Sequence, residues 1–487
     1  MCKVILNLFC KLNIPNLKQT EVKNRIIKAR ELFSSSLIVF FMMLSVSSCK
    51  SGSGITVYQL SDSLVISPDF TVKANSIDVG VERTGSRLDT LKYNLYNGRA
   101  AEDLNVAWFA CSGRVKIEIT ASSDIESFLI RPKSRKIEAV AEGKILSFQI
   151  DGPQHLYIEI NDLPHLAIFA DTPEKDPPEQ NDENTLYFAR GLHNTGKIEL
   201  HSNQTVYVAA GAIVNANIRG DSLENVRILG RGIINGNIRI SRTNNLQVEG
   251  VFIRNRSGWT NTLTDCHNSS YRNVKVFGYE AIYSVDGINP VSCTNFTIDN
   301  CFMRCRDDCV AIKSMDYNLR VDSIFVTNCL MVGWCCSDGI TIGFELNGSP
   351  VQNVFVKNCD ILFARGGGRT GGHSGFSIVC DGPAIVQNIN YEDIRIEEQV
   401  EFKNLELIVT DGKLYGEDQP GHIRGVHMKN ITWENPLKPF IIKGYSAENM
   451  VENITFEKCF AGGRALTDTT DADFSINEYV RDVRFLP

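Results

Sequence analysis

The chain has 487 residues, of which 43% are hydrophobic and 22% are charged. This composition is typical of a globular protein, and the length allows more than one domain. The formal net charge is -7 and no block of lysine or arginine occurs, so the chain lacks the basic patch that nucleic-acid binding requires. We therefore expect no nucleic-acid partner.

The first segment with a recognisable pattern is "LFSSSLIVFFMMLSVSSCKSGSG". Its apolar run, about ten residues from Leu37, is too short to span a bilayer and ends in small residues, as a secretory signal does. The stretch "VSSC" before "KSGSG" resembles a bacterial lipobox, in which Cys49 is lipidated. An ordinary cleaved signal or a membrane anchor is the alternative.

We therefore interpret residues 1–49 as a signal peptide with a lipobox and residues 50–55 as a linker. This interpretation predicts an exported bacterial lipoprotein, in the periplasm or on the outer-membrane surface. Its membrane contact would be the lipid anchor alone.

Residues 56–185 contain short alternating strands, including "KIEIT", "SFLIRP", "ILSFQI" and "LYIEIN". Turn residues separate them and no longer repeat is present, a pattern that favours a small β-sandwich. The segment "ADTPEKDPPEQNDEN" is rich in proline and charge and marks the end of this domain.

Residues 186–487 form the second predicted domain, and from about residue 203 onward they repeat one pattern: an alternating strand, a polar residue or glycine, and a second strand. The central residues follow one another at steps of 23 to 37: Gly250, Asn273, Asn300, Asn328, Asn358, Asp393, Asn430 and Lys458. Such steps without helical periodicity indicate a solenoid of β-coils. We expect each central residue to form a corner and the residue after it to face the core: Val251, Val274, Cys301, Cys329, Cys359, Ile394, Ile431 and Cys459.

The predicted fold class is therefore all-β, with a right-handed parallel β-helix after the sandwich. A propeller or a second sandwich would need a different turn spacing. Since cysteine repeats at the inward position, we expect mostly buried thiols. One or two disulfides are expected among Cys301, Cys305, Cys309, Cys335 and Cys336.

Three consecutive coils carry an aspartate just before an inward-facing strand, in "SVDGIN", "RDDCVAI" and "CSDGITIG". Asp286, Asp308 and Asp338 should stack at the start of their strands, and Asp307 should join them from the bend. Carboxylates ~4.8 Å apart repel, so at least one should retain its proton. A proton donor and a base in one groove are what glycosidic cleavage requires. The alternative is that aspartate merely favours turns.

The blocks "VDGINPVSCTNFTIDNC" and "RDDCVAIKS" resemble the "NTDGI" and "GDDCVAI" blocks of glycoside hydrolase family 28, the polygalacturonases. The stretch "LIRPKSRKIEAVAEGKILSFQIDGPQHLYIEIN" is similar to the sandwich that precedes the β-helix in family 49, the dextranases and isopullulanase. Both families are inverting hydrolases with an aspartate triad. The resemblance implies that Asp307 is the general acid and that Asp286 and Asp308 hold the attacking water.

The chain departs from family 28 at two places. Asp338 replaces the histidine of the family's "GHG", and "GFSIV" replaces "RIK", whose cations bind the galacturonate carboxylate. Arg365, Arg369 and His373, in the insert "FARGGGRTGGHSG", are candidate replacements for those cations. A solvated loop is the alternative reading of this insert.

Other candidate substrate-binding residues lie in coils beside the aspartates. Trp259 and Trp334 would either stack on a sugar ring or pack in the core. Lys313 and Glu345 alternate away from the apolar side of their strands and should face outward near the cleft, together with Asp338.

These patterns predict an exported inverting glycoside hydrolase of a polysaccharide, foremost of the pectic or galacturonan type. We expect a monomer that needs no cofactor and no metal. Three alternatives remain: a dextranase-like hydrolase of neutral α-glucan, a calcium-dependent polysaccharide lyase, and a non-catalytic carbohydrate-binding solenoid.

Overall fold

The computed structural model describes residues 54–85, 103–255, 257–278, 284–334, 337–366 and 373–487. Residues 55–487 form one compact unit. Cys49 with its lipobox and Arg369 lie outside the described residues, as do Cys335 and Cys336. No helix in the described ranges has the length and hydrophobicity needed to cross a membrane.

The first part of the unit is a two-sheet sandwich, as its alternating strands predict. One sheet contains β1 (Ile55–Val57), β4 (Val81–Thr84), β5 (Leu104–Cys111), β7 (Phe128–Arg131), β10 (Gln154–Ile160) and β11 (Leu166–Asp171). The other contains β2 (Phe70–Ala74), β3 (Ile77–Val79), β6 (Val115–Ala121), β8 (Ala139–Glu142) and β9 (Ile145–Ile150). A single short 3-10 helix, η3 (Lys133–Arg135), follows β7 in the described chain. The inward-facing residues of both sheets form one hydrophobic core.

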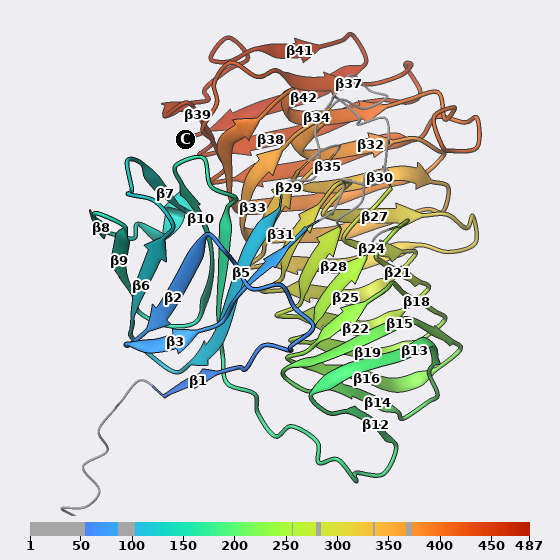
Figure 1. Cartoon of the computed structure of the whole chain (residues 1–487). Helices are drawn as coiled ribbons and strands as arrows, with labels where there is room; N and C mark the ends of the chain where they lie inside the picture. The colour runs from blue at the N-terminus through green and yellow to red at the C-terminus, as the bar shows by residue number, and fades with distance from the viewer. Residues whose placement is uncertain (1–53, 86–102, 256, 279–283, 335–336, 367–372) are drawn as a thin grey trace, which may run out of the picture. The chain divides into compact units, whose positions relative to one another are not determined.

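From β12 onward the chain forms a parallel β-helix, confirming the predicted fold class. Its coils stack in chain order from β12 to β41 (Figure 1). Strands of successive coils pair in parallel, giving three faces that we name A, B and C. β13 (Gly191–Glu199) and β15 (Ala212–Asp221) run across faces B and C, whereas β31 (Val351–Ala364) and β33 (Ile385–Val400) run across faces A and B.

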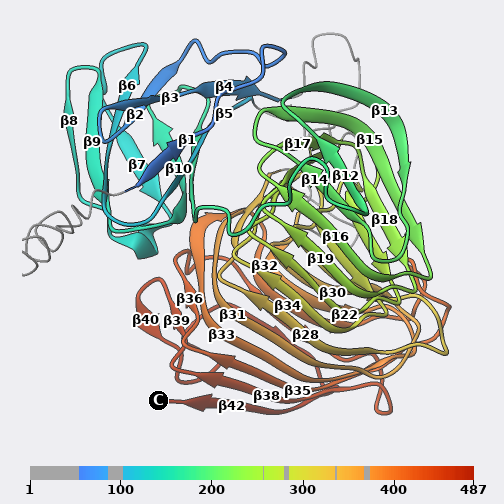
Figure 2. The same ribbon diagram turned by 90° about the horizontal axis from the view of Figure 1, so that it is seen from below.

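The remaining strands belong to one face each. Face A contains β12 (Thr185–Phe188), β14 (Thr205–Val208), β16 (Glu224–Gly230), β19 (Asn244–Glu249), β22 (His267–Arg272), β25 (Thr294–Asp299), β28 (Val321–Thr327), β35 (His422–Lys429), β38 (Val451–Glu457) and β42 (Val480–Leu486), several of which Figure 2 shows in succession. Face B contains β17 (Ile233–Asn235), β20 (Phe252–Asn255), β23 (Lys275–Gly278), β26 (Phe302–Cys305), β29 (Leu330–Gly333), β36 (Thr432–Trp433) and β39 (Phe460–Ala461), with β40 (Arg464–Ala465) antiparallel to β39. Face C contains β18 (Ile238–Ser241), β21 (Asn261–Thr264), β24 (Ile288–Val291), β27 (Val310–Ser314), β30 (Ile340–Leu346), β32 (Ser374–Cys380), β34 (Lys403–Val409), β37 (Phe440–Lys443) and β41 (Phe474–Ile476).

The corner between faces A and B is where the sequence repeat has its central polar residue. Every one of those residues has a positive φ, from Gly250 (81°) and Asn273 (52°) to Lys458 (52°). Asparagine tolerates this left-handed conformation, and its amide also bonds to the next coil, as Asn358 Nδ2 does to Asn328 Oδ1 at 2.8 Å. The residues that follow the corner are all buried in the core of the β-helix, as predicted.

Face B packs against the sandwich. An aromatic cluster crosses this interface and includes Trp108 and Phe169 of the sandwich with Phe252 and Phe302 of the β-helix. Buried ion pairs accompany it: Arg131 with Glu397, Arg254 with Glu82, and Lys275 with Asp171. The sandwich therefore covers face B.

The described cysteines correct one prediction. Cys301, Cys305 and Cys309 are buried free thiols, so none of the three forms a predicted disulfide with another described cysteine. Each coil needs a small apolar residue at the inward position, and a thiol fills that space without a partner.

Candidate active site

Three aspartates stack at the starts of neighbouring strands on face C. Ile288 of β24 pairs with Val310 of β27, which pairs with Ile340 of β30, and an aspartate lies two residues before each of them. The backbone ladder extends through the aspartates, since Gly287 N donates to Asp308 O at 2.8 Å and Cys309 N donates to Asp338 O at 3.1 Å. Asp286, Asp308 and Asp338 therefore occupy one column, one per coil.

Asp307 joins this column from the bend before β27 and is half-buried. Its Oδ2 accepts a hydrogen bond from Ser284 N at 2.6 Å, and its Oδ1 accepts one from Asp308 N at 3.0 Å. Two backbone donors thus fix a carboxylate that stays more accessible than its neighbours. On a regular strand, one of the adjacent residues Asp307 and Asp308 would point into the core. The bend avoids this, since neither side chain belongs to the core of the β-helix.

Asp286 is only 3% exposed. Burial, followed by the nearby charge of Asp307, raises the pKa of Asp286 to about 8, although Lys313 acts in the opposite direction. Asn289 Nδ2 donates to Asp286 Oδ2 at 2.6 Å and fixes the orientation of the carboxyl group. This side chain therefore holds a proton through the neutral pH range.

Asp308 is 5% exposed and lies between the other carboxylates. Burial and the charges of Asp307, Asp338 and Asp286 raise its pKa well above the usual value. Asp338 N donates to Asp308 Oδ1 at 2.9 Å, which connects the two coils. Burial first, and then the predicted repulsion in the column, thus raise the pKa of both Asp286 and Asp308.

Asp338 behaves differently because it has strong hydrogen-bond donors. Burial alone would raise its pKa, but His373, Ser377 and Ser374 N together lower it. Ser377 Oγ donates to Asp338 Oδ2 at 2.6 Å and Ser374 N donates to Oδ1 at 2.5 Å. Asp338 is consequently the ionised anchor of the column.

His373, from the glycine-rich insert, lies beside Asp308 and Asp338. Its Nδ1 is 3.4 Å from Asp338 Oδ1 and 3.9 Å from Asp308 Oδ1. Burial alone would lower the pKa of His373, but Asp338 raises it above the usual value. The structure therefore brings this predicted residue into the site.

Lys313 and Glu345 form an ion pair next to Asp286. Lys313 Nζ is 2.6 Å from Glu345 Oε2 and 4.9 Å from the ring centre of Trp259. Burial alone would lower the pKa of Lys313, but Glu345 and Asp286 raise it. The predicted outward residues and a half-buried tryptophan are thus together beside the column.

Trp334 corrects a second prediction, because it is 2% exposed and belongs to the aromatic cluster between sandwich and β-helix. The guanidinium groups of Arg304 and Arg365 both lie 4.6 Å from its ring centre, and Phe363 packs beside it. Trp334 is a core residue that cannot stack on a sugar. Arg365 likewise stacks on the aromatic cluster.

Sequence reasoning missed several residues that complete the site. Ser374 and Ser377 bind Asp338, and Asn289 binds Asp286, as described above. Lys403 pairs with Ser374 in the ladder, one coil further, and its Nζ is 2.7 Å from Glu406 Oε1, with both side chains buried. Counting two residues back from each inward position of face C would have found Ser374 and Lys403.

Three side chains of the site lie close enough together to be compared with a metal centre. Asp308, Asp338 and His373 offer ligand atoms within 4.8 Å of one another. The Asp338 oxygens, however, already accept hydrogen bonds from Ser374 and Ser377, and Asp308 Oδ1 accepts one from Asp338 N. The geometry favours a carboxyl cluster held by hydrogen bonds over a metal site.

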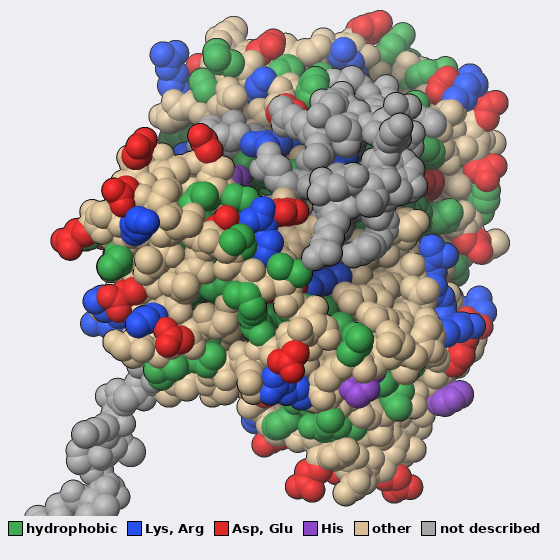
Figure 3. Space-filling view, in the orientation of Figure 1, with side chains coloured by type: hydrophobic (Ala, Val, Ile, Leu, Met, Phe, Trp, Pro, Cys, Tyr) green, Lys and Arg blue, Asp and Glu red, His purple; other side chains and the backbone are tan. Residues whose placement is uncertain are grey.

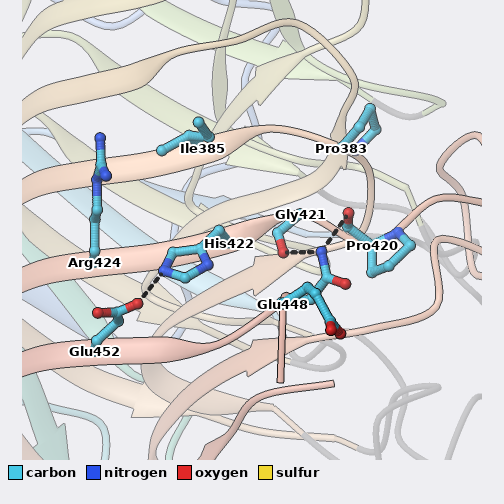
Figure 4. Close-up of a pocket in the computed structure, with 9 residues that line it drawn as sticks. Pro383, Ile385, Pro420, Gly421, His422, Arg424, Glu448 and Glu452 are labelled. Carbon is cyan, nitrogen blue, oxygen red and sulfur yellow. Dashed lines mark hydrogen bonds and ion pairs between the residues drawn. The ribbon is translucent and has the colours of Figure 1, made fainter. Parts of the chain in front are cut away.

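The surface outside the column offers weaker candidates. On the face seen in Figure 3, lysine and arginine side chains are interspersed with acidic ones. A hollow of about 320 Å³ lies at the start of β35, where His422, Arg424, Glu448 and Glu452 line it (Figure 4). His422 Nε2 pairs with Glu452 Oε2 at 2.8 Å, so these polar groups satisfy one another.

Comparison with known proteins gives a family match over the middle of the chain. Residues 233–436 match glycosyl hydrolases family 28. The probable exopolygalacturonase B of Neosartorya fischeri is 24% identical over 160 residues, which are 31% of this chain and 33% of that protein. Exopolygalacturonase B of Aspergillus niger is 24% identical over 164 residues, 31% of this chain and 34% of that protein. The match thus spans about a third of these relatives.

A solved structure shares the fold over a longer range. Dex49A from Penicillium minioluteum superposes with a TM-score of 0.63 at 14% identity, covering 88% of this chain and 96% of that chain. Since 88% exceeds the β-helical part, the likeness includes the sandwich.

Proposed function

We propose, from the family 28 signature in residues 233–436, that this chain hydrolyses glycosidic bonds of a pectin-type polysaccharide by aspartate acid–base catalysis. One observation carries the proposal. Asp286, Asp307, Asp308 and Asp338 meet at one edge of face C, and the pKa of Asp286 is raised to about 8. A carboxyl cluster that retains a proton near neutral pH can donate one to a leaving group.

Asp307 is the proposed general acid because it is the most accessible of the four carboxylates. Asp286 and Asp308 are the proposed holders of the attacking water. At rest the protons reside on these buried partners, since burial favours their neutral form. In the proposed reaction one of these protons passes to Asp307, which gives it to the leaving oxygen, and the carboxylate left behind takes the proton of the attacking water.

The proposed reaction inverts the anomeric centre. Asp307 comes from the bend, whereas Asp286 and Asp308 come from the column, and this difference in origin leaves room for a water between acid and base. An inverting pair needs about 6.5 to 9.5 Å between carboxyl groups, against about 5 to 5.5 Å for a covalent mechanism.

We also propose that the chain is exported as a monomeric lipoprotein through Cys49. The support is the sequence alone: a short apolar run, small residues and a polar linker. Polysaccharides are too large to cross a membrane, so an exported enzyme would meet them outside the cell.

The test is Asp307→Asn, assayed by release of reducing ends from pectic polysaccharides. The amide cannot donate the proton, so turnover should fall by about 10²- to 10⁴-fold while circular dichroism stays unchanged. Asp322→Asn is the matched control, because Asp322 is a partly buried carboxylate on face A. Equal activity of Asp307→Asn and wild type would contradict the assignment.

The same assay separates the alternatives. A calcium-dependent lyase would lose activity in a chelator and form unsaturated products, and a binding solenoid would release no reducing ends. Chelator-insensitive release of saturated products is the outcome that the proposal requires.

A further inference from the structure

The cations that the structure describes around the proposed site, Lys313, Lys403 and His373, are already matched by carboxylates. Lys313 pairs with Glu345 at 2.6 Å, Lys403 pairs with Glu406 at 2.7 Å, and His373 lies 3.4 Å from Asp338. Each positive group thus has its own negative partner within the site. A negatively charged ligand would therefore have to compete with a carboxylate of the protein for each of these three cations.

The charge balance of the cluster is consequently negative. Within the part of the chain that the structure describes, its cationic side chains are Lys313, His373 and Lys403. Its carboxyl groups are twice as many: Asp286, Asp307, Asp308, Asp338, Glu345 and Glu406. Protons on Asp286 and Asp308 reduce the excess but do not reverse it.

A uronate carboxylate placed beside Lys313 would therefore meet Glu345 and Asp286 as well. Glu345 and Asp286 raise the pKa of Lys313, which shows that the ammonium group already interacts with carboxyl groups of the protein. Because Asp286 retains its proton, the repulsion comes from the Glu345 carboxylate, and it would offset the attraction to the single ammonium group.

A neutral sugar suits the same pair well. The Lys313 ammonium donates hydrogen bonds and the Glu345 carboxylate accepts them, whereas a sugar hydroxyl can do both. Trp259 is half-buried, and its ring lies 4.9 Å from Lys313 Nζ, where it can contact the apolar face of a sugar.

We propose that the sugar bound at the Lys313–Glu345 pair is neutral, so that the substrate is a neutral glycan, such as a neutral side chain of pectin, and not a polyuronate. This inference rests on the proposed function, because it identifies the substrate class of the same site. Lys313, Glu345 and Trp259 are then the residues that determine specificity.

The test measures binding separately from turnover. Chains carrying Asp307→Asn, which should bind without cleaving, are run by affinity electrophoresis through gels containing arabinan, galactan, dextran or polygalacturonate. We expect retardation by at least one neutral glycan and none by polygalacturonate. Adding Glu345→Gln should weaken that neutral-glycan binding by about tenfold, because the amide loses the charge-assisted hydrogen bond.

Glu392→Gln is the matched control, since Glu392 forms a similar ion pair with Lys357 at 3.0 Å where β33 and β31 pair away from the column. This control should bind as the parent chain does. Strongest retardation by polygalacturonate, further strengthened by Glu345→Gln, overturns the inference, and so does the absence of retardation by every neutral glycan.

Wild-type turnover distinguishes the two proposals. If the retained neutral glycan is never cleaved, the hydrolase assignment fails and the binding inference stands. If polygalacturonate alone is bound and cleaved, the neutral-glycan inference fails and the hydrolase assignment stands.

Discussion

Replacing Asp286 by asparagine should stabilise the fold in a strongly pH-dependent manner. The unfolded chain releases this proton near pH 3.9, whereas the folded chain retains it to about pH 8 because the group is buried beside Asp307. As pH rises between these values, the unfolded state ionises first and the folded state loses stability. Asparagine cannot ionise, and its carbonyl oxygen can still accept the hydrogen bond from Asn289.

The magnitude follows from the same pKa difference. Each pH unit between about 4 and 8 should add ~1.4 kcal/mol to the stability gained by Asp286→Asn. The gain should be near zero at pH 4, ~3 kcal/mol at pH 6 and at most ~6 kcal/mol at pH 8. Turnover should be lost at every pH, because the variant no longer binds the attacking water through a carboxylate.

Urea unfolding of wild type and Asp286→Asn at pH 4, 5, 6, 7 and 8, followed by circular dichroism, measures this slope. Asp322→Asn is the control with the opposite sign. Burial alone would raise the pKa of Asp322, but hydrogen bonds from Asn353, Gln352 and Ser323 together lower it, so its replacement should cost stability at pH 7. A gain for Asp286→Asn that does not change with pH would refute the reasoning about burial.

Two further predictions concern the anchor of the column and the stereochemistry. His373→Gln should reduce stability most between about pH 4 and 6.5. In this range His373, whose pKa is raised, and Asp338, whose pKa is lowered, are both charged and form their ion pair. Equal urea midpoints of variant and wild type at pH 5.5 would contradict this prediction. Proton NMR of the first-formed product, recorded before mutarotation, should show the anomer opposite to the substrate linkage; a retained anomer would make one of these aspartates a nucleophile.

The coil geometry was predictable because it depends on local sequence. A polar residue at each corner, such as Asn300 or Asn328, takes positive φ whatever surrounds it, and the residue after it must fill the core. The column of aspartates follows from the same repeat, since parallel pairing places equivalent positions of successive coils side by side. Local pattern therefore fixed both the fold class and the core of the site.

The parts that were not predictable depend on contacts between distant segments. Trp334 is buried because the sandwich covers face B, and no feature near Trp334 in the sequence indicates that partner. The pairing of Lys313 with Glu345 needs an irregularity, since the β27–β30 register shifts between Ile312 and Ser314. The extra residues of β30 let Glu345 reach Lys313, which simple alternation along two strands could not indicate.

The structure also explains why a costly cluster persists at this place. Asp286 and Asp308 lower the stability of the folded state above about pH 4, as a group whose pKa is raised by burial must. The β-helix can carry that cost because each coil is held on both sides by a parallel ladder and by the continuous core beneath it.

Removing the charges would make a more stable solenoid, so their retention in successive coils is an argument for chemistry over structure. Asp338 differs from these two, because donors from the next coil stabilise its charge and keep one carboxylate ionised beside two that retain protons. Neighbouring carboxyl groups in opposite protonation states are the condition for acid–base catalysis, and here the stacking of coils produces that condition.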